Sequence, residues 1–209
     1  ILVYWEKDAR PGRNWEDLLH RQLKGLARIG IDPKTEIEVS IALQDYQWQV
    51  SDLVEQLRVI KSPAEIALTR RVANYWTEAM NDMLAVAKVG VTGGELMAVG
   101  GKITDTIFAK EPSANWINTK LIQFFQCAPA SSSPHHASSR VDERLPHGPT
   151  TINAIGSVCD YYAENERTIL TGDYTTEQAD YFDITHRAHE LALSLVKPGV
   201  PCADVDYAV

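Results

Sequence analysis

Two glutamates in one short segment and a pair of adjacent histidines are the residues whose types and spacing indicate chemistry. Glu164 and Glu166 are two positions apart in a segment with strand character, so their side chains lie on the same face. A carboxylate there can bind a planar cationic group through charge-assisted hydrogen bonds. His135 and His136 lie in a polar loop upstream. A histidine titrates near neutral pH, so it can take a proton from water and give one to a leaving nitrogen, as hydrolysis of an amide or amidine C–N bond requires.

The same residues also have purely structural explanations. The Pro-His-His sequence at 134–136 is compatible with a solvated loop. Glu166 precedes Arg167, and the two can form an ordinary ion pair of small energetic value. Which explanation holds depends on the elements that position these side chains.

A second pair of histidines lies further along the chain. His186 and His189 are one helical turn apart and could both face a metal ion. Leu193 and Val196 continue the same side of that helix, which favours a packing face over a metal site.

Local patterns predict an N-terminal α/β segment, then two helices, a block of strands and two further helices. Three capping boxes mark helix starts, at Ser62–Glu65, Thr92–Glu95 and Thr175–Gln178. The predicted helices follow residues 14, 62, 92, 175 and 203, and the predicted strands cover 36–43, 121–127, 150–158 and 161–170. From residue 62 onward this order is typical of an α+β domain.

Composition excludes several classes of function. The net charge is −8 and no basic stripe occurs, which argues against a nucleic-acid partner. Charged residues interrupt every apolar run, so we expect no membrane span. The three cysteines, Cys127, Cys159 and Cys202, are scattered and indicate neither a disulfide framework nor a metal site. This pattern favours a cytoplasmic protein.

Four stretches of the sequence resemble, in the same order, motifs of the creatinase and Xaa-Pro peptidase family. They are residues 58–66, 134–140, 161–168 and 197–205. The resemblance implies an α+β catalytic domain of the pita-bread fold over residues 56–209, incomplete in its C-terminal half. It also implies that residues 1–55 are a remnant of the small N-terminal domain that precedes the catalytic domain in this family.

The resemblance bears on metal binding as well. Peptidases of this family hold two divalent ions, of Mn, Co or Zn, with two aspartates, a histidine and two glutamates. Asn153 and Glu164 stand at the positions of the two aspartates. A neutral amide oxygen is a weaker ligand for a divalent ion than a carboxylate is. The creatinases work without metal and resemble this chain more closely, because they have an asparagine at the position of Asn153 and a Tyr-Tyr pair before Glu-Arg-Thr.

The expected function is therefore a creatinase-like, metal-independent hydrolysis of a C–N bond in a small substrate, by a homodimer. The resemblance makes His135 or His136 the catalytic histidine and places Glu166, Glu164 and Asn153 in the substrate pocket. Two alternatives remain: a metal-dependent Xaa-Pro dipeptidase or aminopeptidase with two divalent ions, and a pita-bread domain that binds peptides or proteins without catalysis.

Overall fold

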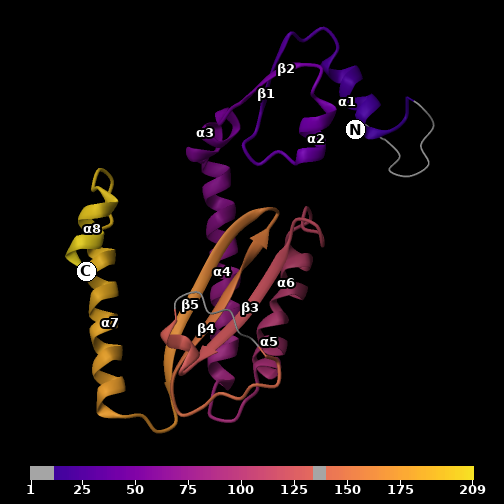
Figure 1. Cartoon of the computed structure of the whole chain (residues 1–209). Helices are drawn as coiled ribbons and strands as arrows, with labels where there is room; N and C mark the ends of the chain where they lie inside the picture. The colour runs from indigo at the N-terminus through magenta and orange to yellow at the C-terminus, as the bar shows by residue number, and fades with distance from the viewer. Residues whose placement is uncertain (1–11, 134–139) are drawn as a thin grey trace. The chain divides into compact units, whose positions relative to one another are not determined.

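The computed structural model describes residues 12–133 and 140–209, and it divides into two compact units, Ile1–Ser62 and Pro63–Val209 (Figure 1). His135 and His136, the predicted catalytic histidines, lie outside the described residues. The assignment of residues 1–55 to a remnant of an N-terminal domain stays a prediction.

The first unit is a small α/β segment. Its elements are α1 (Trp15–Leu23), β1 (Arg28–Ile31), α2 (Ile37–Ala42), β2 (Gln47–Val50) and α3 (Leu53–Val59). The strands β1 and β2 pair in parallel. Asn14 caps α1 as predicted, because its side-chain oxygen accepts a hydrogen bond from the Asp17 amide at 2.7 Å.

The strand predicted at residues 36–43 is wrong, because this segment forms the helix α2. The apolar residues Ile37, Val39 and Ile41 alternate, which imitates a strand, but they lie between the paired strands β1 and β2. Two parallel strands need a crossover connection, which is usually helical. The pairing of β1 with β2 therefore decides the conformation of the segment between them.

The second unit is a three-stranded antiparallel sheet with helices. Its elements are α4 (Pro63–Val86), α5 (Gly93–Gly101), α6 (Ile103–Lys110), β3 (Lys120–Cys127), the 3-10 turn η1 (Ala130–Ser132), β4 (Gly148–Val158), β5 (Tyr161–Thr171), α7 (Thr176–Leu195) and α8 (Cys202–Ala208). The strand order is β3-β4-β5. The strands and helices predicted for this unit are confirmed, with ends that differ by a few residues.

Two of the three predicted capping boxes are formed in the structure. The Glu95 amide donates to Thr92 Oγ1 at 3.2 Å, and the Gln178 amide donates to Thr175 Oγ1 at 3.2 Å. In each case the side chain of the third residue accepts a hydrogen bond from the cap amide in return. The capping role of Ser62 at the start of α4 stays a prediction.

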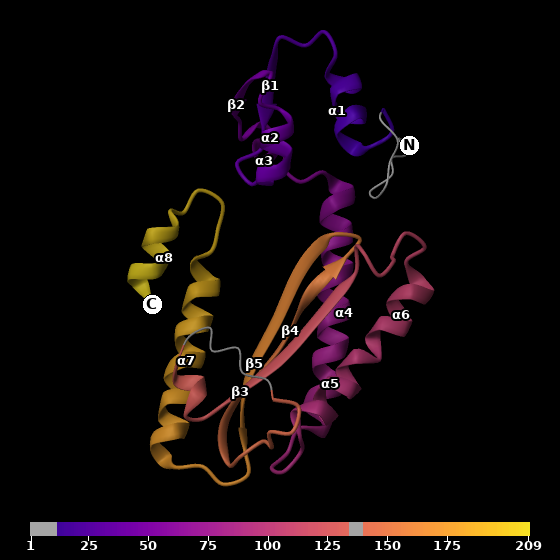
Figure 2. The ribbon, with the colours of Figure 1, turned by 45° about the vertical axis from the view of Figure 1, so that its right-hand side comes forward.

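The core lies between one face of the sheet and the helices α4 and α5 (Figure 2). Trp76 of α4 is fully buried, and its indole Nε1 donates to the Gly156 carbonyl of β4 at 3.3 Å. Phe125 of β3 is buried against α5, where a Cβ on Gly93 would stand 1.9 Å from the Phe125 ring. Glycine at position 93 is what allows this close approach.

Because successive side chains of a strand point to opposite faces, the core fixes which residues lie on the other face. Phe125, Ile152 and Ala163 pack with the helices. The alternate residues of each strand, which point the other way, therefore share the face away from α4 and α5. By strand, they are Ile122, Phe124 and Gln126 on β3, Thr151, Asn153, Ile155 and Ser157 on β4, and Tyr162, Glu164, Glu166 and Thr168 on β5. This second face is called the open face below.

Candidate functional site

Three of the predicted site residues meet on the open face. Asn153 of β4 is directly opposite Glu166 of β5, and Glu164 is one strand step further along the same face. The side-chain Nδ2 of Asn153 donates to Oε1 of Glu164 and, at 3.0 Å, to Oε2 of Glu166. One amide group thus holds two carboxylates. Their role as a substrate-binding group stays a prediction.

Asn153, Glu164 and Glu166, called the trio below, differ in their exposure to solvent. Asn153 is fully buried, whereas Glu164 and Glu166 are exposed. Among the described residues, the side-chain Oδ1 of Asn153 has no hydrogen-bond partner. A buried amide oxygen without a partner loses the hydrogen bonds that it would make in water. The site therefore has an acceptor that a bound group can satisfy.

The ion pair between Glu166 and Arg167 that the sequence left open does not form. The Arg167 guanidinium donates to the backbone carbonyl of Glu166 at 2.6 Å instead. Within residues 12–133 and 140–209, no Lys, Arg or His side chain comes within 4.0 Å of the Glu164 or Glu166 carboxylate. Two negative charges therefore lie side by side without a cation from this part of the chain, and a cationic ligand would relieve their repulsion.

The side-chain oxygen atoms of the trio are suitable ligands for one hard cation. Two carboxylates and one amide oxygen without a partner are oxygen ligands of the kind that Mg²⁺ and Mn²⁺ bind. The part of the chain that the structure describes has no cluster of three or more His, Cys, Asp or Glu side chains that could hold a metal ion. A pair of ions would thus need ligands beyond this trio.

Among the described residues, the second pair of histidines forms no metal-ligating cluster. His186 and His189 lie on α7. His189 Nδ1 lies 3.7 Å from Oε1 of the neighbouring Glu190. The packing face predicted for this helix is also not seen, since α7 buries none of its residues and Leu193 is 57% exposed.

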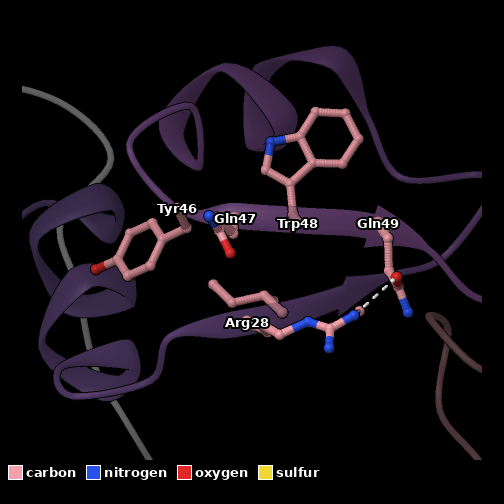
Figure 3. Close-up of a pocket in the computed structure, with 7 residues that line it drawn as sticks. Arg28, Tyr46, Gln47, Trp48 and Gln49 are labelled. Carbon is pink, nitrogen blue, oxygen red and sulfur yellow. Dashed lines mark hydrogen bonds between the residues drawn. The ribbon is translucent and has the colours of Figure 1, made fainter.

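A shallow hollow lies on the first unit, over the strands β1 and β2. Its labelled lining residues are Arg28, Tyr46, Gln47, Trp48 and Gln49 (Figure 3). Arg28 donates to Gln49 at 3.4 Å, and Trp48 is 42% exposed. Among the described residues, this lining contains no carboxylate, histidine or thiol.

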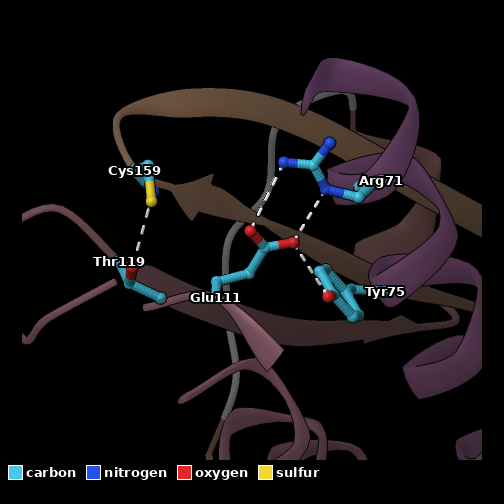
Figure 4. A network of polar contacts seen from close by, with 5 residues as sticks. All are labelled: Arg71, Tyr75, Glu111, Thr119 and Cys159. Atoms are coloured by element: carbon cyan, nitrogen blue, oxygen red, sulfur yellow. Dashed lines mark hydrogen bonds and ion pairs between the residues drawn. The ribbon is translucent and has the colours of Figure 1, made fainter. Parts of the chain in front are cut away.

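A polar network that the sequence did not indicate joins α4 to the end of α6. Arg71 donates to Glu111 at 2.8 Å, and the Tyr75 hydroxyl donates to the same carboxylate at 3.0 Å (Figure 4). The hydrogen bond from Arg71 lowers the pKa of Glu111, although partial burial opposes this effect. Burial, followed by the hydrogen bond to Glu111, raises the pKa of Tyr75. No periodic signal could have found this pair, because its members are forty residues apart.

Comparison with known proteins establishes the family of the chain. The sequence model of metallopeptidase family M24 matches residues 67–209, which include the whole three-stranded sheet and the trio. The chain belongs to this family. An uncharacterized peptidase of Staphylococcus aureus is 28% identical over 155 residues, which cover 74% of this chain and 42% of that protein. An Xaa-Pro dipeptidase of Pyrococcus horikoshii is 21% identical over 197 residues, or 91% of this chain and 53% of the relative.

Solved structures show the same fold. The prolidase from Pyrococcus horikoshii aligns with a TM-score of 0.77 at 20% identity, over 91% of this chain and 54% of that protein. The prolidase from Pyrococcus furiosus aligns with a TM-score of 0.74 at 19% identity, over 90% and 54%. The pita-bread, α+β fold expected for this chain is confirmed, and the chain spans about half the length of these relatives.

The comparisons change the balance between the expected functions. The matched family is one of metallopeptidases, and the similar structures named above are prolidases. Neither comparison supports the expectation of a creatinase-like, metal-independent enzyme, and the metal-dependent alternative is nearer to both. Among the described residues, no helix has the length and apolar character needed to cross a bilayer.

Proposed function

We propose that the protein to which this chain belongs hydrolyses the C–N bond of a small peptide substrate with the help of a divalent cation, in the manner of an Xaa-Pro dipeptidase. The observation that carries the proposal is the pair of carboxylates on one amide, Glu164 and Glu166 with Asn153, on the open face of an M24 domain. The relatives with Xaa-Pro dipeptidase or prolidase names support the substrate class.

In this proposal each residue of the trio has a separate task. The exposed Glu164 and Glu166 carboxylates bind the cation, and Asn153 orients both of them from its buried position between the strands. A divalent ion bound there would polarise the scissile carbonyl and lower the pKa of a coordinated water. His135 or His136 is proposed to protonate the leaving nitrogen. Further ligands would come from parts of the protein outside this trio.

A second candidate is the creatinase-like, metal-independent hydrolysis of an amidine or amide. Asn153 favours it, because a neutral side chain at this position removes one of the charges that the family's peptidases use to hold metal. In this case the Glu164 and Glu166 carboxylates would bind a guanidinium group directly, through charge-assisted hydrogen bonds. This resemblance to the creatinases rests on the sequence motifs.

One set of assays separates these functions. Purified whole protein is incubated with Ala-Pro, Leu-Pro and creatine, with either EDTA or MnCl₂, and products are measured by chromatography. Hydrolysis of the dipeptides that MnCl₂ restores after EDTA treatment supports the main proposal. Hydrolysis of creatine in EDTA would establish the second candidate instead. Binding of the dipeptides without cleavage under any condition would contradict both and indicate a non-catalytic domain.

We also propose that the whole protein is a cytoplasmic homodimer. Support for the compartment comes from its cysteines, since Cys127, Cys159 and Cys202 are all free. Support for the dimer comes from the resemblance to creatinases and from exposed apolar residues such as Trp48 on the first unit. Light scattering at micromolar concentration tests the dimer, and a stable, active monomer would contradict it.

A further inference from the structure

A contact between His147 and Asp173 closes the end of the β4–β5 ladder, where the chain turns into α7 (Figure 1). The imidazole Nδ1 of His147 accepts a hydrogen bond from the backbone amide of Asp173 at 2.8 Å. The same nitrogen lies 3.4 Å from Oδ2 of the Asp173 side chain. Asp173 therefore offers the ring two different groups, an N–H donor and a carboxylate acceptor.

The surroundings of the ring fix its position against the turn. A Cβ on Gly172 would stand 2.6 Å from His147 Nδ1 and 2.6 Å from a methyl carbon of Val89, so glycine is what leaves room for the ring. The Thr171 hydroxyl donates to the Pro146 carbonyl at 2.6 Å, which ties the residue before His147 to the end of β5. The ring is therefore held between two backbone segments, although much of it is exposed to solvent.

The turn after β5 determines where α7 begins. The helix α7, which the structure describes in full, buries none of its residues and packs mainly with α8. Figures 1 and 2 show α7 beside the sheet and joined to it through this turn. The capping box that starts α7 at Thr175 follows Asp173 closely. A change in the hydrogen bonds of Asp173 is therefore transmitted to the first turn of α7.

We propose that His147 is a pH-sensitive switch that exchanges the hydrogen-bond partners of this turn. A neutral imidazole accepts a hydrogen bond at the nitrogen that carries no proton, as Nδ1 does from the Asp173 amide. Histidine side chains gain a proton near neutral pH, and both ring nitrogens then donate. Protonated Nδ1 releases the Asp173 amide and donates to the Asp173 carboxylate, which loosens the turn and the start of α7. The switch does not depend on the proposed function.

The charged groups around the ring leave Asp173 as its partner. The segments packed around the ring carry charged side chains at Lys88, Arg144, Asp173 and Glu177. Of the two carboxylates, Asp173 is the one that lies within 4.0 Å of a ring nitrogen among the described residues. Arg144 donates to the Gly90 carbonyl at 2.6 Å, so a backbone group holds its guanidinium. A proton on Nδ1 is therefore stabilised by Asp173.

Hydrogen-exchange mass spectrometry of the whole protein tests the switch. Exchange of the peptide that contains Asp173 is measured at pH 8 and pH 5, and the intrinsic rate at each pH is divided by the measured rate to give the protection. We expect protection in the wild type to be about fivefold lower at pH 5, because one hydrogen bond is lost. The experiment is done in EDTA and repeated with MnCl₂. The same fall is expected in both, since the trio lies elsewhere on the ladder.

Substitutions assign the effect to the two partners. His147→Asn keeps an acceptor oxygen near the place of Nδ1 and does not titrate, so its protection should be the same at pH 8 and pH 5. His147→Ala has no acceptor and should show low protection at both pH values. Asp173→Asn keeps the backbone amide but offers the protonated ring no carboxylate, so the fall should need a lower pH. His189→Asn is the matched control and should behave like the wild type, because His189 also lies beside a carboxylate, 3.7 Å from that of Glu190.

Each result either supports or overturns the switch. A fall in protection that His147→Asn abolishes and His189→Asn retains supports it. Equal protection at both pH values in the wild type would overturn it, and so would a fall that persists in His147→Asn, which assigns the effect to another group. Wild-type protection of His147→Ala at pH 8 would show that the ring does not hold the turn. Circular dichroism verifies that each variant is folded.

Discussion

Nδ2 of Asn153 donates a hydrogen bond to Oε2 of Glu166 at 3.0 Å across the β4–β5 ladder, between two residues that stand directly opposite each other. The same nitrogen also donates to Glu164. An aspartate at position 153 could not make these bonds, because a carboxylate has no N–H to donate. The asparagine therefore stabilises an arrangement of two carboxylates that a third carboxylate would disrupt in the absence of a cation.

Replacement of Asn153 by aspartate should change metal affinity and stability in opposite directions. A third carboxylate raises the negative charge of the ligand set, so Mn²⁺ should bind about tenfold more tightly or better. In EDTA the same variant should unfold at a lower temperature than the wild type, because three like charges repel each other. Calorimetry and thermal melts with and without MnCl₂ measure both effects. Equal Tm values in EDTA would contradict this account of Asn153.

Gly156 should tolerate no side chain. A Cβ at this position would stand 1.9 Å from the Lys120 carbonyl oxygen on β3, and backbone cannot move aside as a flexible side chain can. Gly156→Ala should therefore reduce the free energy of unfolding by about 1–3 kcal/mol, as measured by urea denaturation. Gly101→Ala is the matched control, because its Cβ would meet nothing closer than 3.9 Å. A Gly156→Ala protein as stable as the control would refute the close approach of β3 and β4.

The Arg71–Glu111 pair should contribute stability that depends on pH. The pKa of Glu111 is lowered in the folded protein by Arg71, so the contribution is present at pH values above the ordinary carboxyl pKa. It is lost as the pH falls through the lowered pKa of the folded state. Urea denaturation between pH 7 and pH 3 should show that Glu111→Gln removes about 1 kcal/mol at neutral pH and less in acid.

The exposed pair Arg140–Asp142 provides the comparison for this experiment. Its side chains are 74% and 68% exposed, whereas that of Glu111 is 12% exposed. Solvent screens an exposed pair strongly, so Asp142→Asn should leave the free energy of unfolding almost unchanged at every pH. Equal losses in Glu111→Gln and Asp142→Asn would show that burial does not strengthen the Glu111 pair.

The predicted catalytic histidine can be tested in the whole protein. His135→Ala should abolish turnover while substrate still binds, because removal of a proton donor affects the reaction more than the binding. The comparison of kcat with KM for His135→Ala and His136→Ala decides which of the two acts. Near-wild-type kcat in both variants would remove histidine from the proposed mechanism.

Short-range signals explain how much of the fold could be predicted. The capping boxes at Thr92 and Thr175 depend on residues three positions apart, and the sequence shows them directly. Alternation over 161–170 placed Glu164 and Glu166 on one face for the same reason. The family motifs added Asn153, whose contact with them depends on the β4–β5 register.

Long-range pairing explains what the sequence did not show. The segment 36–43 alternates like a strand, but the parallel pairing of β1 with β2 makes it a helix. The Arg71–Glu111 contact and the pairing of Phe124 on β3 with Asn153 on β4 likewise depend on which elements pack or pair, and no local pattern encodes this. The sequence left open an ion pair between Glu166 and Arg167, and the structure shows instead that Arg167 donates to the backbone carbonyl of Glu166.

The measurement that tests the central claim most directly is calorimetric titration of MnCl₂ into EDTA-treated, dialysed whole protein and its variants. If Glu164 and Glu166 bind the cation, each of Glu164→Gln and Glu166→Gln should weaken Mn²⁺ binding about tenfold or more. Asp105→Asn, which removes an exposed carboxylate from α6 on the other side of the sheet, should bind like the wild type. Wild-type affinity in both glutamate variants would contradict the claim that this pair of carboxylates is a cation site.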